Sequence, residues 1–135
     1  MQLDASLQQI LSQKDLVVER FYELFLGRDA DVRQLFAAVD MKQQSVMLTM
    51  ALMMVESHYS HSYPATEHYL KVLGHRHHQM GVKPELYVKF RDCLLAALEV
   101  FHADDWDQHL AGQWRKAIEK ATATMLEGYE RDYIY

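Results

Sequence analysis

The sequence contains few of the residues that interrupt helices or cross-link a chain. Its 135 residues include two prolines, five glycines and a single cysteine, Cys93. So few prolines and glycines leave little room for turns, which favours long helices. One cysteine can form neither an internal disulfide nor a cysteine cage around a metal ion. The fold therefore has to depend on a packed core, and a composition that is 50% hydrophobic can supply one.

The chain also lacks an excess of basic charge and any long apolar segment. Its formal net charge is −5, so we expect no nucleic-acid partner. The longest apolar stretch, "VMLTMALMMV" (46–55), is about half the length of a membrane span. The first residues, "MQLDASLQQI", have neither the basic start nor the apolar block of a signal peptide. We therefore expect a cytoplasmic protein without a membrane partner.

Hydrophobic spacing predicts helices in the first half of the chain. Four apolar residues share one face at three- and four-residue spacing: Val17, Phe21, Leu24 and Phe25. We expect Gly27 to end this helix as its C-terminal cap, and the following "DADVRQLF" to form a short turn. Asp40 precedes Gln43 by three residues, which is the spacing of a capping box at the start of a methionine-rich helix ending near Ser57.

Helical spacing continues through the second half. A helix is expected from about Thr66, and Pro84 suits the first turn of the next one. Asp104 or Asp105 is expected to cap the last helix. No segment keeps a strand-like period of two for long. The chain is therefore predicted to be all-α, with six or seven helices in one domain over residues 1–135.

The segment "LGHRHHQMGV" (73–82) contains three histidines within four positions. His77 follows Leu73 by one helical turn and so continues the apolar stripe. His75 and His78 are rotated from it by about 160° and 100°, which predicts that they face solvent. A three-histidine metal site would need all three on one face. One inward imidazole remains, and it is either a satisfied core histidine or the axial ligand of a haem.

Five motifs occur in the order and spacing of one known family. They are "FYELF" with Tyr22, "LF" with Phe36, "DMKQQSVML", "LGHRHHQMGV" with His77, and "ELY" with Tyr87. Through them the sequence resembles the globin family, and most of all its bacterial branch of flavohaemoglobins and single-domain relatives. The resemblance runs from about Val17 to Tyr129 and implies a globin fold that encloses one haem b (iron protoporphyrin IX).

The resemblance also implies roles for particular residues. Tyr22 and a glutamine would line the distal pocket, where a gas binds to the iron. His77 would be the iron ligand, and Tyr87 would touch it. The residues expected to contact the cofactor are Phe36, Leu48, Leu73, His77, Val82 and Tyr87.

Two adjacent glutamines compete for the distal position. Gln44 is preferred because Leu48 then lies one turn later at the apolar distal position. The alternative pairs Gln43 with Met47, and Gln43 is also a candidate for the capping role.

One departure from the flavohaemoglobin pattern concerns the proximal side. In that pattern a glutamate follows the last-helix tryptophan by fifteen residues and completes a His–Tyr–Glu network. Counting from Trp114 leads here to Tyr129, while Glu127 and Glu130 are out of phase. A carboxylate on the proximal imidazole would make it more electron-donating. Without one, peroxidase-like chemistry is disfavoured.

The resemblance implies binding of O2, NO and CO, by a monomer or a homodimer. Nitric oxide dioxygenation would need an external reductase, because the chain has no G-x-G-x-x-G motif for a dinucleotide. A gas-sensing or redox-sensing module without turnover is the alternative. A globin-fold protein that has lost haem is a third hypothesis, disfavoured because Tyr22, Phe36 and His77 occur together.

Overall fold

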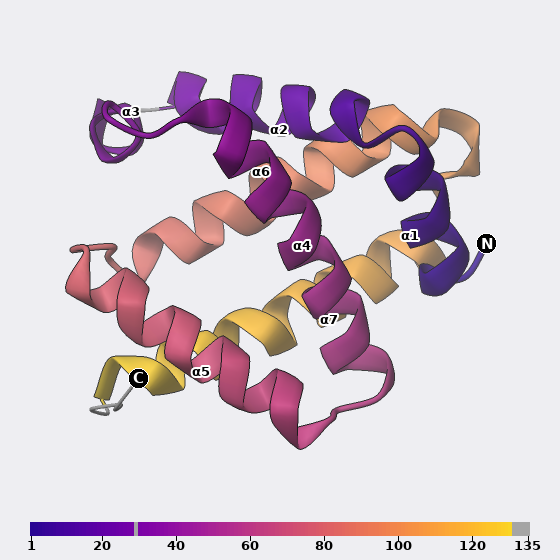
Figure 1. Ribbon diagram of the computed structural model, residues 1–135. Coiled ribbons are helices and arrows are strands. Elements are labelled where there is room, and N and C mark those ends of the chain that lie inside the picture. The colour runs from indigo at the N-terminus through magenta and orange to yellow at the C-terminus, as the bar shows by residue number, and fades with distance from the viewer. Residues whose placement is uncertain (29, 131–135) are drawn as a thin grey trace.

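The protein is built from helices joined by short turns (Figure 1). The structure is a computed structural model that describes residues 1–28 and 30–130, and no β-strand occurs in that part. The predicted all-α class is confirmed, with seven α-helices and two short 3₁₀ helices among the described residues. They are α1 (Leu3–Ser12), α2 (Lys14–Arg28), α3 (Ala30–Leu35), α4 (Met41–Ser60), α5 (Pro64–Gln79), α6 (Glu85–His102), η1 (Ala103–Asp105), α7 (Gln108–Glu127) and η2 (Gly128–Glu130). None of the described helices is both long and apolar enough to cross a membrane.

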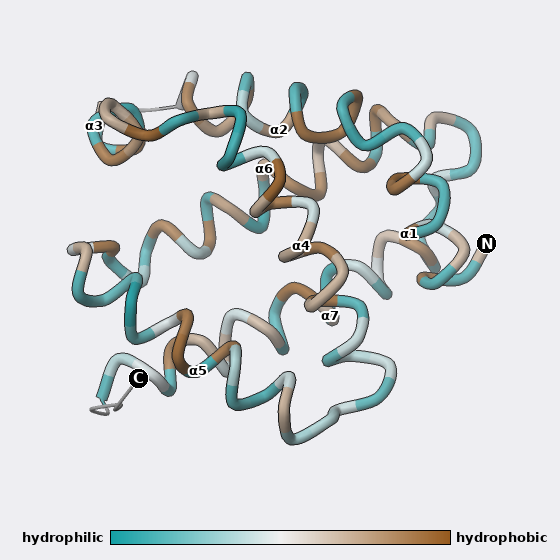
Figure 2. The backbone as a smooth tube through the Cα atoms, in the orientation of Figure 1, coloured by the Kyte–Doolittle hydropathy of each residue, from teal (hydrophilic) through white to brown (hydrophobic). Residues whose placement is uncertain are grey.

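The core forms where α2, α4, α6 and α7 pack against one another, with α1 covering one end. Figure 2 shows hydrophobic and hydrophilic residues following one another along each helix, as expected for helices with one buried side. The largest fully buried side chains include Ile10, Phe21, Leu52, Leu94 and Trp114. Each buried apolar side chain of this size contributes about 1.5–3 kcal/mol relative to exposure.

Side-chain caps fix where two of the helices begin. The Asp40 carboxylate accepts a hydrogen bond from the Lys42 amide at 2.9 Å, so the predicted N-cap of α4 is confirmed. The cap of α7 was wrongly predicted. Asp107, and neither Asp104 nor Asp105, accepts from the amide of Leu110 at 2.8 Å. The two earlier aspartates lie in η1, a 3₁₀ turn between α6 and α7 that the spacing of apolar residues does not reveal.

Three helix ends differ from the sequence-based prediction. Gly27 was expected to end α2, but the helix continues to Arg28, since an exposed helical glycine costs only about 1 kcal/mol. The segment expected to be a turn forms α3. Helix α4 extends to Ser60 rather than Ser57, and α5 starts before Thr66, with Pro64 as its first residue.

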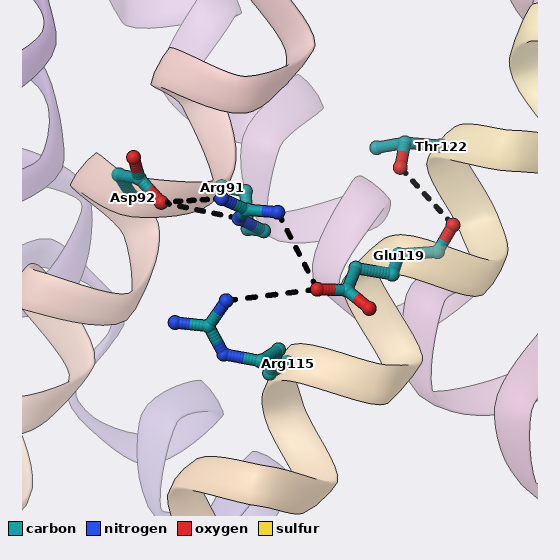
Figure 3. A network of polar contacts seen from close by, with 5 residues as sticks. All are labelled: Arg91, Asp92, Arg115, Glu119 and Thr122. Atoms are coloured by element: carbon teal, nitrogen blue, oxygen red, sulfur yellow. Dashed lines mark hydrogen bonds and ion pairs between the residues drawn. The ribbon is translucent and has the colours of Figure 1, made fainter.

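A surface ion-pair network joins α6 to α7 (Figure 3). Glu119 of α7 lies 3.4 Å from the Arg91 guanidinium of α6 and 3.6 Å from that of Arg115. Arg91 also pairs with its neighbour Asp92 at 3.1 Å. Exposed pairs of this kind contribute about 0–1 kcal/mol each. The network therefore bridges the two helices at the surface but adds little to the free energy of unfolding.

Helices α4 and α5 diverge from the connection between them, as Figure 1 shows. The start of α4 and the end of α5 therefore lie at the wide end of this V. The start of α4 carries Gln44 and the end of α5 carries His77. The arrangement of the two helices thus separates the two sets of predicted site residues.

Candidate functional site

His77, in the last turns of α5, has one ring nitrogen in a hydrogen bond. Its Nδ1 lies 2.7 Å from the carbonyl oxygen of Leu73, one turn earlier. A carbonyl only accepts, so Nδ1 carries the proton and Nε2 keeps its lone pair. Burial lowers the pKa of His77, and the bond to Leu73 partly opposes that effect. The side chain is thus a neutral imidazole with one nitrogen able to coordinate a metal.

Tyr22 of α2 pairs with Gln44 of α4. The tyrosine is buried, and its hydroxyl lies within hydrogen-bonding reach of the Gln44 side chain. Burial raises the pKa of Tyr22, while the bond with Gln44 lowers it. Gln43, one residue earlier, is exposed. Of the two glutamines, the structure brings Gln44 to the tyrosine.

Apolar side chains surround this pair. The Phe36 ring meets the Tyr22 ring edge-on with centroids 5.8 Å apart, and the Phe25 ring lies 6.0 Å from that of Phe36. Leu48, one turn after Gln44, is buried. Phe36 itself is only half-buried. An aromatic surface that the protein leaves partly uncovered can cover one face of an apolar cofactor.

A second group of aromatic residues lies beside His77. The Tyr87 ring of α6 is buried, with its centroid 6.3 Å from that of His77. The hydroxyls of Tyr87 and Tyr129 are 3.2 Å apart, and the Tyr129 hydroxyl donates to the Val82 carbonyl at 2.7 Å. Burial raises the pKa of Tyr87, and its bond to Tyr129 acts in the same direction. At the place where the flavohaemoglobin pattern has a carboxylate, this chain therefore has a phenol.

The prediction that His75 faces solvent is wrong, whereas His78 is exposed as predicted. His75 is buried and donates from Nδ1 to the Gly128 carbonyl oxygen at 3.1 Å. The cause is a second covered face on α5, which packs against α7 and η2. Gly74 marks this contact, since a Cβ at that position would collide with the carbonyl oxygen of Met125.

The arrangement fits a haem better than a bare metal ion. No group of three or more His, Cys, Asp or Glu side chains in the described part of the chain could hold a metal. Nε2 of His77 is left to coordinate iron, and Leu73 and Val82 near it are apolar yet only half-buried. A flat apolar cofactor that brings four of its own iron ligands needs such surroundings.

Comparison with known proteins establishes the family. Residues 19–125 match the sequence model of the Globin family, and the chain belongs to that family. Globins bind haem, so haem-based gas binding is the general function of the class. The predicted globin fold is confirmed.

One solved structure resembles this chain over nearly its whole length. The chain is similar in structure to PA3967 from Pseudomonas aeruginosa PAO1, whose crystal structure is described as structurally highly homologous to a human hemoglobin. The match has a TM-score of 0.77 and 23% sequence identity, and covers 93% of this chain and 99% of that one. At this identity the likeness shows the fold alone. No curated protein sequence matches the chain.

Proposed function

We propose that this globin holds haem b through Nε2 of His77 and binds O2 beside Tyr22 and Gln44. The pairing of the Tyr22 hydroxyl with the Gln44 side chain carries the proposal. It supports a distal pocket, because a buried tyrosine from α2 and a half-buried glutamine from α4 meet where two hydrogen-bond donors would face a gas ligand. Phe36, with its ring beside that of Tyr22, supplies the apolar contact.

The proximal role belongs to His77. Its Nδ1–H bond to the Leu73 carbonyl fixes the tautomer and the ring orientation, which leaves Nε2 as the iron ligand. When bound, haem supplies a ferrous iron that takes diatomic gases. Leu48, Leu73, Val82 and Tyr87 complete the proposed cofactor contacts.

The distal role belongs to Tyr22 and Gln44. Because burial raises the pKa of Tyr22, the phenol keeps its proton at neutral pH and can donate it. A donor aimed at a partly negative ligand oxygen contributes about 1–3 kcal/mol in a dry site. Since about 1.4 kcal/mol is tenfold, two donors slow O2 release by orders of magnitude. Slow release suits reaction or scavenging better than transport.

Nitric oxide dioxygenation is the reaction we propose for such a pocket. O2, NO and one electron give nitrate. The electron comes from a separate reductase, because the chain has no dinucleotide-binding motif. If the protein is instead a gas-sensing or redox-sensing module, reductant and NO will give no turnover.

The O2 dissociation rate of haem-loaded protein tests the distal assignment. We expect Tyr22→Phe to accelerate dissociation by about tenfold or more. Tyr63→Phe is the matched control, because Tyr63 is 53% exposed and should leave the rate unchanged. An unchanged rate in Tyr22→Phe would show that the distal assignment is wrong. Nitrate formation with NO and a reductase then separates an enzyme from a sensing module.

A further inference from the structure

Tyr129 of η2 links the Tyr87 side chain to the backbone at Val82 through two hydrogen bonds near His77. A phenol has one proton, and the Val82 carbonyl can only accept, so the Tyr129 proton goes to Val82 at 2.7 Å. The Tyr129 oxygen then accepts from the Tyr87 hydroxyl at 3.2 Å. The chain of hydrogen bonds therefore runs from Tyr87 through Tyr129 to the backbone of the segment between α5 and α6, and every group in it is neutral.

The end of α7 and η2 also contact α5 directly. His75 donates to the Gly128 carbonyl oxygen at 3.1 Å, and Lys71 forms an ion pair with Glu127 at 3.6 Å. These contacts reach α5 two and six residues before His77. The last residue of α7 and the backbone of η2 thereby hold the part of α5 that carries the proposed iron ligand.

Close backbone packing makes this contact rigid. A Cβ at Gly128 would collide with the Lys71 carbonyl oxygen, and one at Gly74 with the carbonyl oxygen of Met125. The end of α7 and the start of η2 therefore meet the middle of α5 at a distance that only glycine permits. Small shifts of η2 have to move α5 with it, because no side-chain layer lies between them to absorb the change.

We infer that Glu127, Gly128 and Tyr129 form a latch that positions His77 by holding α5 and the segment between α5 and α6. Tyr129 is the central positioning residue of this latch. It occupies the place beside Tyr87 from which a carboxylate would raise the electron donation of the proximal ligand. His77 Nδ1–H then donates to the Leu73 carbonyl oxygen, a neutral acceptor, which favours gas binding over cleavage of an O–O bond. The inference rests on the proposed function, since it assigns the latch a role toward a bound haem.

Two substitutions at Tyr129 test the latch, with Thr124→Val as the matched control. Tyr129→Phe keeps the ring and removes the hydroxyl, whereas Tyr129→Glu introduces a carboxylate beside Tyr87. Thr124 lies five residues earlier, in α7, and its hydrogen bonds go to His58 of α4 and to Lys120 within α7. Thr124→Val therefore removes a buried hydroxyl without altering the latch.

Two readouts are needed, one of them independent of haem. In haem-free protein, we expect Tyr129→Phe to accelerate amide hydrogen exchange in residues 80–84 by about fivefold to tenfold. In haem-loaded ferrous protein, it should shift the iron–histidine stretching band seen by resonance Raman spectroscopy. Tyr129→Glu should raise that frequency and lower the midpoint potential. Thr124→Val should change neither the exchange, the stretching band nor the midpoint potential, although it should lower the free energy of unfolding about as much as Tyr129→Phe does.

The outcomes separate the two proposals. If Tyr129→Phe leaves both exchange and the stretching band unchanged, or if Thr124→Val shifts them equally, the latch is wrong. If the wild-type protein takes up no haem, the proposed function is wrong. In that case faster exchange in Tyr129→Phe would still show a latch on the segment between α5 and α6, and its assigned role toward haem would be overturned.

Discussion

The Gln44 side chain on α4 lies within hydrogen-bonding reach of the Tyr22 hydroxyl on α2 and lowers the pKa of Tyr22, while neighbouring Gln43 is exposed. This asymmetry gives a matched pair of substitutions. We expect Gln44→Leu to speed O2 dissociation from the haem-loaded protein by about tenfold, because one donor is lost. Gln43→Leu should leave the rate as it is. Stopped-flow displacement of O2 by CO measures both, and equal effects would reject the assignment of Gln44.

Close packing between α5 and α7 predicts a large effect of a single methyl group. A Cβ at Gly74 has no space beside the Met125 carbonyl, so Gly74→Ala should destabilise the protein by about 1–3 kcal/mol or more. Gly112, which is also helical, has nothing within 4 Å of such a Cβ. Gly112→Ala should stabilise by up to about 1 kcal/mol through helix propensity. Thermal denaturation of the two variants is the measurement, and a stable Gly74→Ala would contradict the packing.

The buried His58 predicts a loss of stability in mild acid. Thr124 donates its own proton to the Lys120 carbonyl, so it accepts from the Nε2–H of His58 at 3.0 Å. The buried Nδ1 has no hydrogen-bond partner. Burial first, and then the charge of Lys120, lower the pKa of His58, while Glu67 and Glu127 act in the opposite direction. The folded protein therefore resists protonation at this position.

The direction of this pH dependence of stability follows from proton linkage. Below the unfolded pKa of about 6.5, the unfolded chain binds a proton that the folded protein does not. The contribution of neutral His58 to the free energy of unfolding is fully present above that pH. It is lost as the pH falls through the folded pKa, at no more than about 1.4 kcal/mol per pH unit. Urea denaturation between pH 7 and pH 5 should show the decline. His58→Gln should flatten it and His61→Gln, at an exposed position, should not; equal slopes in all three proteins would contradict the assignment.

Much of the fold is encoded in local sequence. Three- and four-residue spacing is sufficient to predict the helices and to place His77 on the stripe that contains Leu73. Local spacing does not choose between Gln43 and Gln44 in the same way, because the two residues are adjacent on one helix. The choice is decided by contact with Tyr22, which belongs to another helix. Local periodicity therefore finds the elements, and long-range packing selects the residue.

The proximal side could not be predicted as fully. Helical phase relative to one apolar stripe puts His75 in solvent, but α5 has a second face covered by α7 and η2. Gly74, in the middle of that helix, was a usable signal, since an interior glycine often marks close approach of another backbone. The bond from Tyr129 to Val82 spans 47 residues, and no short-range pattern encodes it.

Coordination of haem iron by His77 is the central claim, and an absorption spectrum tests it most directly. Protein mixed with one equivalent of haem, reduced and exposed to CO should show the sharp Soret band of a histidine-ligated globin. His77→Gly should lose that band and regain it when imidazole is added to fill the space left by the side chain. If His77→Gly binds haem with the same affinity and spectrum as the wild-type protein, the iron ligand lies elsewhere and the account is contradicted.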